Sequence, residues 1–138
     1  MKRKTAKKMI SYIFAAMLLF AGNMTSLAKS ADVAILANMT WTSDSDHTDS
    51  RSGQYSTVYA RCYSVYPDSG TDTFKQIRCR VTNGYGGVIS DEVLLSESAS
   101  SNSTITIKEG YLSTRFVGFQ FRGNTKASAN ASVYYNGR

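Results

Sequence analysis

Residues 55–66 read Y-S-T-V-Y-A-R-C-Y-S-V-Y, and this stretch decides the fold class. Small or aliphatic side chains occupy the even positions from Val58 to Ser64. The odd positions carry the larger side chains Tyr55, Tyr59, Arg61 and Tyr63. A repeat of two residues places alternate side chains on opposite faces, which is the pattern of a β-strand with one buried face. The stretch therefore predicts a strand near 54–66.

The same repeat covers most of the remaining chain, and turn-forming Gly, Asn, Asp and Ser residues separate the segments. Strands are predicted near 33–41, 54–66, 74–82, 87–95, 103–108, 112–122 and 127–135. About seven short strands with no apolar helical stripe predict an all-β fold. We expect a small single-domain antiparallel β-sandwich that is Ig-like or jelly-roll-like.

The segment R-F-V-G-F-Q-F-R at 115–122 is apolar on both faces, with Val117, Phe119 and Phe121 on one of them. Such a strand is typical of the centre of a sheet, or of a strand whose outer face meets a partner. We predict core packing. Small residues in the last segment, such as Ala129 and Ala131, suit an inner face packed against these phenylalanines.

The two cysteines lie in neighbouring predicted strands. Cys79 shares a face with Ile77 and Val81, and Arg78 and Arg80 share the other face. A hairpin of 54–66 with 74–82 that sets Cys62 opposite Cys79 would place all apolar side chains inward. It would also permit a disulfide, which is the usual state of a cysteine pair in an exported protein. A disulfide between two sheets is the alternative.

The first 28 residues have the three parts of a secretory signal peptide. A basic start is followed by 14 mostly apolar residues, Met9 to Gly22, and by small residues that place the cut after Ala28. We expect a secreted, extracellular β-sandwich domain at 29–138 with no membrane span. Five of the 16 basic residues leave with the leader, so the net charge falls from +6 to +1. This near-neutral charge argues against a nucleic-acid partner.

The predicted hairpin would gather tyrosines and arginines on one outward face. These candidate binding residues are Tyr55, Tyr59, Arg61, Tyr63, Arg78 and Arg80. Tyrosine and arginine are enriched at interfaces and can stack on sugar rings, so the partner would be a cell-surface glycan, a cell-surface protein or a second copy. The alternative is cross-strand pairing that only stabilises the sheet.

The segment S-D-S-D-H-T-D-S-R-S at 43–52 contains the single histidine, His47. Asp44, Asp46 and Asp49 are weak candidates for a cation site, because the glycine and glutamate of a calcium loop are missing. A single histidine without an identifiable nucleophile favours no catalytic residue and no cofactor. We expect a polar, solvated connector between strands.

The closing A-S-V-Y-Y-N at 131–136, about one twentieth of the chain, resembles the end of the lactococcin-972-like bacteriocins. These are small exported β-sandwich proteins of Gram-positive bacteria, and the resemblance implies an antibacterial protein that acts on a target cell envelope. The residues themselves favour a small secreted, non-enzymatic binding module of bacterial origin. The antibacterial protein is the alternative, and a small secreted hydrolase with a site around His47 is the third hypothesis.

Overall fold

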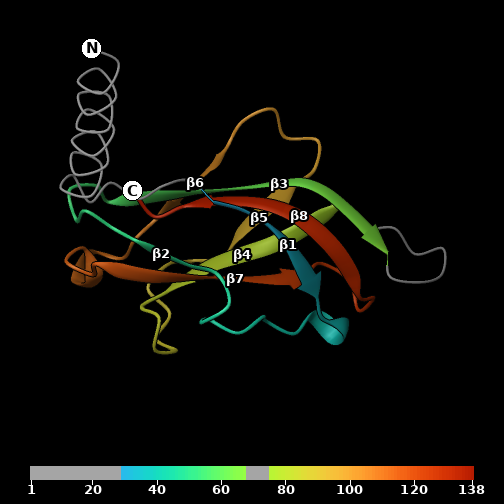
Figure 1. Cartoon of the computed structure of the whole chain (residues 1–138), viewed down its shortest axis with the longest axis horizontal. Helices are drawn as coiled ribbons and strands as arrows, with labels where there is room; N and C mark the ends of the chain where they lie inside the picture. Colours follow the sequence, from blue (N-terminus) through green and yellow to red (C-terminus); the bar gives the residue numbers. More distant parts are fainter. Residues whose placement is uncertain (1–28, 68–74) are drawn as a thin grey trace, which may run out of the picture.

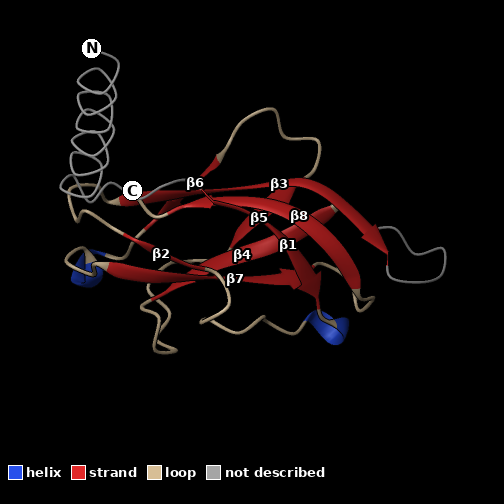
Figure 2. Ribbon diagram, in the orientation of Figure 1, coloured by secondary structure: helices blue, strands red, loops and turns tan. Residues whose placement is uncertain are grey.

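The computed structural model describes residues 29–67 and 75–138, so the expected signal peptide at 1–28 lies outside the described residues. The described part is almost entirely β-structure, with two short 3-10 helices at opposite ends of the molecule (Figure 2). Its elements are β1 (Lys29–Ile35), η1 (Ala37–Met39), β2 (Thr48–Ser50), β3 (Thr57–Pro67), β4 (Gln76–Thr82), β5 (Val93–Ser96), β6 (Ser103–Thr106), η2 (Glu109–Tyr111), β7 (Phe116–Gly123) and β8 (Ala129–Asn136).

The strands form two antiparallel sheets of four strands each. The first sheet has the order β1-β8-β3-β6 and the second has the order β2-β7-β4-β5. In Figure 1, β3 and β8 of the first sheet lie above β4 and β7 of the second. The all-β, antiparallel prediction is confirmed, with eight strands in the described residues where about seven were predicted. Eight strands whose connections repeatedly cross between two sheets correspond to a jelly roll and not to the Ig order.

Apolar side chains from both sheets fill the space between them. Val117, Phe119 and Phe121 of β7 are completely buried, as predicted from the alternation. The Phe119 ring lies 5.0 Å from the ring of Tyr135 on β8, which joins the two sheets across the core. Ala129 and Ala131 on β8 are also buried, and their small side chains leave room for these rings.

The predicted hairpin between the two cysteine-containing segments is wrong. β3 pairs with β8 and β6, whereas β4 pairs with β7 and β5, so Cys62 and Cys79 belong to different sheets. Cys62 lies opposite Val133, and Cys79 lies opposite Phe121. Alternation reports which side chains share a face but not which strand is the neighbour. The predicted turn at 70–71 lies outside the described residues.

The predicted disulfide is not formed in the structure. Both cysteines are buried free thiols within the core. Burial raises the pKa of the Cys62 thiol to about 11, with a smaller contribution from the nearby Glu97 carboxylate. Burial also raises the pKa of Cys79. Both groups therefore remain protonated at neutral pH, where a thiol is a poor nucleophile.

Candidate functional site

The six predicted binding residues do not share one face, because β3 and β4 lie in different sheets. Tyr59, Arg61 and Tyr63 point away from the core of the first sheet, since their neighbours Ala60 and Cys62 are buried. Arg78 and Arg80 lie on the opposite outer face of the molecule, on the second sheet. The structure thus replaces the single predicted face with two surfaces.

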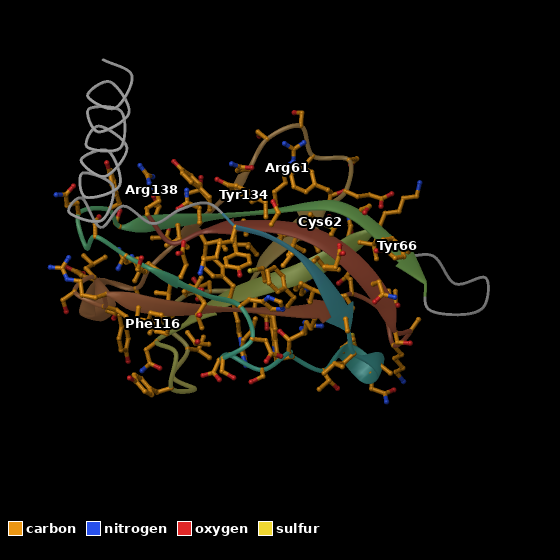
Figure 3. The ribbon with its side chains drawn as sticks, in the orientation of Figure 1. Arg61, Cys62, Tyr66, Phe116, Tyr134 and Arg138 are labelled. Atoms are coloured by element: carbon orange, nitrogen blue, oxygen red, sulfur yellow. The ribbon has the colours of Figure 1, made fainter. Side chains whose placement is uncertain are left out.

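The outer surface of the first sheet, which we call the tyrosine face, is lined by aromatic rings and two arginines. Its members are Tyr55, Tyr59, Arg61, Tyr63, Tyr66, Tyr134 and Arg138. Arg61 on β3 lies directly across from Tyr134 on β8. Figure 3 shows Arg61, Tyr134 and Arg138 along this side of the molecule, with Tyr66 at the far end of β3.

Arg138 fixes two rings at one end of the tyrosine face. Its guanidinium carbon lies 3.9 Å from the ring centroid of Tyr55 and 4.6 Å from that of Tyr59, which are cation–π distances. The same guanidinium donates hydrogen bonds to the Tyr59 hydroxyl at 2.8 Å and to the Thr57 hydroxyl at 3.1 Å. These contacts limit the rotamers of both tyrosines before any ligand binds.

Arg61 has the same role in the middle of the tyrosine face. Its guanidinium lies 4.9 Å from the Tyr63 ring centroid and donates to the carbonyl oxygen of Ala99 at 2.9 Å. The pairing of β3 with β8 shifts between Cys62 and Ser64, so Tyr63 is the extra residue of a β-bulge. Bulges re-aim a side chain, and Tyr63 is 47% exposed.

Sequence reasoning did not identify Tyr66, Tyr134 or Arg138 as members of this face. Tyr134 could have been identified, because the alternation of the last segment places its side chain on the other face of the strand from the inward-facing Val133 and Tyr135. Tyr66 lies on the outer face only because of the bulge: before it the odd-numbered residues of β3 point outward, and after it the even-numbered residues do. Arg138 lies beyond the end of β8 and carries no periodic signal.

The outer surface of the second sheet, which we call the arginine face, consists of Trp41, Arg78, Arg80, Glu92, Gln120 and Arg122. Arg80 donates to the side-chain oxygen of Gln120 at 2.7 Å, and its guanidinium lies 4.2 Å from the centroid of the Trp41 ring. Gln120 in turn donates to the carbonyl oxygen of Thr42 at 2.9 Å. The segment around Trp41 is thereby attached to the sheet.

The segment 43–52 is more structured than predicted, because it contains β2. Asp49 is 3% exposed and accepts hydrogen bonds from the amides of Gly137, at 2.7 Å, and Ser50, at 2.9 Å. The Lys29 ammonium lies 3.9 Å from the Asp49 carboxylate. Asp49 is therefore an internal anchor for the last strand, and the prediction of a fully solvated connector is wrong at this point.

The other acids of this segment do not join Asp49 in a metal site. Among the described residues, no three His, Cys, Asp or Glu side chains are grouped so that they could hold a metal ion. Asp46 is exposed, and the backbone carbonyl of Asp44 packs against Gly118. Asp44 and Asp46 lie in a turn before β2, whereas Asp49 lies on β2 itself.

His47 is half-buried beside the core. Its ring makes edge-on contacts with Phe121, at 5.7 Å between centroids, and Tyr135, at 5.9 Å. Burial lowers the pKa of His47, and the nearby Asp46 carboxylate opposes this shift. The ring serves as an aromatic packing element at this position.

No helix in 29–67 or 75–138 has the length and apolar character needed to cross a membrane. The sequence matches no family model, and no curated protein matches it. Among solved structures, the chain is similar to one titled "Bacillus endospore appendages form a novel family of disulfide-linked pili". The two chains are 16% identical with a TM-score of 0.30, and the match covers 81% of this chain and 88% of that chain. A likeness at this level gives no information on function.

Proposed function

We propose that the protein is an exported, non-enzymatic binding module that recognises a cell-surface glycan through the tyrosine face. The observation that carries this proposal is the set of tyrosine rings held by Arg61 and Arg138 on the outer surface of the first sheet, of which Tyr55 and Tyr63 are exposed. Tyrosine supplies a flat apolar ring together with a hydroxyl. This combination suits a sugar, which presents a C–H face and a rim of hydroxyl groups.

The shape of the tyrosine face favours a chain ligand. Tyr59 and Tyr66 are seven residues apart on β3, which corresponds to about 23 Å at the usual rise of a strand. Arg61 and Arg138 make no ion pair within 4.0 Å with an acid among the described residues, so their charge is free to interact with a ligand. A polysaccharide can lie along such a surface, stack on successive rings and accept hydrogen bonds from the guanidinium groups.

Two features support binding over catalysis. His47, the only histidine of the chain, is packed between Phe121 and Tyr135. The thiols of Cys62 and Cys79 are buried in the core with raised pKa values. The single histidine and both cysteines are thus committed to packing.

The test is retention of the purified protein on isolated cell-wall polysaccharide. The variant Tyr63→Ala/Tyr66→Ala removes two rings that are 47% and 46% exposed. We expect binding to weaken at least tenfold, because an exposed aromatic contact contributes about 1 kcal/mol or more. Tyr111→Ala is the control, since Tyr111 is 44% exposed but lies on η2, outside the tyrosine face.

Equal binding by the wild type and the double variant would overturn the proposal, as would an equal loss in the Tyr111→Ala control. Thermal melts of all three proteins exclude unfolding as the cause of a loss. If protease treatment of the wall abolishes retention while removal of its polysaccharide does not, the partner is a protein and the glycan assignment is wrong.

A further inference from the structure

Two positively charged side chains lie next to each other on the outer surface of the second sheet. Arg78 on β4 and Arg122 on β7 are direct partners in the antiparallel register. Side chains at such positions lie within about 5 Å at their Cβ atoms, and like charges there destabilise the sheet. The arrangement therefore needs a compensating anion.

The compensation within the described residues is incomplete. Both guanidinium groups approach the same carboxylate oxygen of Glu92, Arg78 at 3.7 Å and Arg122 at 3.4 Å. The Glu92 side chain is 39% exposed, so solvent screens its charge. Arg80, the next outward residue on β4, makes no ion pair with an acid in the described part of the chain. Arg78 and Arg122 thus share one carboxylate, and Arg80 is paired with none among the described residues.

The remaining contacts hold the arginines in place without neutralising them. Arg78 donates to the side-chain oxygen of Asn124 at 3.4 Å. Arg80 is fixed by Gln120 and by the ring of Trp41. The guanidinium of Arg122 also lies over Trp41, at 5.2 Å from its centroid. Neutral partners and an aromatic ring preorganise the cations and preserve their charge.

One further acid, Asp44, lies toward the other end of the same face. Its backbone carbonyl packs against Gly118, two residues before Gln120 on β7. One oxygen of its carboxylate is buried and has no hydrogen-bond partner, and no arginine of the face lies within ion-pair distance of it. Asp44 therefore lowers the net positive charge of the region without neutralising the Arg78–Arg122 pair.

We propose that the arginine face binds a polymer whose backbone carries phosphodiester groups. The guanidinium fork matches the non-bridging oxygens of a phosphate and holds them through charge-assisted hydrogen bonds. Arg78 and Arg80 are two residues apart on one strand, about 7 Å, and a short phosphodiester repeat spans a similar length when extended. Successive phosphates can then reach the Arg78–Arg122 pair and Arg80 together. This site is separate from the tyrosine face and does not depend on the proposed glycan function.

The experiment measures binding of the full protein to poly(glycerol phosphate), a phosphodiester polymer without rings or bases, at low salt. Arg78→Gln/Arg122→Gln removes the cross-strand pair. We expect at least tenfold weaker binding and a salt dependence whose logarithmic slope falls by roughly one to two, because two phosphate contacts are lost. Lys108→Gln/Arg115→Gln is the matched control, since it removes the same charge from positions outside the arginine face.

The control variant is expected to bind like the wild type. Arg78→Lys/Arg122→Lys keeps the charge but removes the planar forks, and it is expected to bind with an intermediate affinity. An equal loss in the control, or equally tight binding of the polycarboxylate polygalacturonate, would show that net charge alone is responsible and would overturn the proposal. A wild-type protein that fails to bind poly(glycerol phosphate) at low salt would do the same.

Discussion

Raising the pH above 9 is expected to destabilise the protein through its two buried thiols. Cys62 and Cys79 are at most 1% exposed. Burial raises the pKa of Cys62 from its ordinary value of 9.0 to about 11, and it raises that of Cys79 as well. The unfolded chain therefore releases these protons near pH 9 while the folded chain retains them. Because the folded pKa is the higher one, the stability is unaffected below pH 9 and falls as the pH rises toward 11.

The magnitude follows from the size of the shift. A pH of about 10 lies roughly one unit above the pKa of each thiol in the unfolded chain, whereas both thiols of the folded chain are still mostly protonated at this pH. One unit corresponds to about 1.4 kcal/mol, so the two thiols together cost roughly 2–3 kcal/mol of unfolding free energy. Other ionisable side chains also respond to alkaline pH. The comparison is therefore made with Cys62→Ala/Cys79→Ala, which retains every other titrating group.

Urea unfolding of both proteins, prepared without reductant, gives the measurement. The stability of the wild type is expected to fall by roughly 2–3 kcal/mol more than that of the variant between about pH 8 and pH 10. Alkylation after unfolding is expected to label both cysteines. A stability difference that stays constant with pH, together with unlabelled cysteines, would refute the reasoning and would indicate a disulfide between the two sheets.

Three further predictions concern the packing. Gly118→Ala would place a methyl group 2.7 Å from the hydroxyl of Thr82 and against the backbone of Asp44. We therefore expect the free energy of unfolding in urea to fall by about 1–3 kcal/mol. Gly110→Ala is the control, because the space around Gly110 is open and the substitution should have little effect. Asp49→Asn weakens two hydrogen bonds from backbone amides, of which the bond from Gly137 is buried, and hydrogen exchange at the end of β8 should become measurably faster. Phe119→Ala empties the centre of the core and should cost about 3–5 kcal/mol in the same unfolding assay.

The faces of the strands could be predicted from the sequence because alternation is a local property. Ala60 and Cys62 point inward and Arg61 points outward because successive side chains of a strand lie on opposite faces, which a few consecutive residues already show. The neighbours of each strand could not be predicted. Consecutive strands usually pair, but β3 and β4 lie in different sheets, and nothing in the alternation distinguishes these arrangements.

The same limit explains β2. Its three residues, Thr48–Ser50, are too short to show a repeat, and the buried member is an aspartate. The burial of Asp49 is tolerated because its carboxylate accepts a hydrogen bond from the backbone amide of Gly137, which lies 88 residues away in the sequence. A contact over that distance leaves no trace in the local pattern, so the acids of this segment resembled a candidate cation site. The buried Arg51 is similar, since the carbonyls of Leu112 and Thr114 accept its hydrogen bonds at 3.1 Å.

The separation of the predicted site into two surfaces leads to a final prediction about their independence. The tyrosine face and the arginine face belong to different sheets, and the sandwiched core lies between them, since face-to-face sheets pack about 10 Å apart. Effects of substitutions at this separation usually add within about 0.5 kcal/mol. We therefore expect Arg78→Gln/Arg122→Gln to leave retention on wall polysaccharide unchanged.

The converse measurement completes the test. Tyr63→Ala/Tyr66→Ala is expected to leave the affinity for poly(glycerol phosphate) unchanged, because neither ring contacts the second sheet's outer surface. Combining the four substitutions should then weaken both activities by the amounts seen separately. If the arginine variant alone released the protein from the polysaccharide, both ligands would share one binding surface. The assignment of separate partners to the two outer faces would then be wrong.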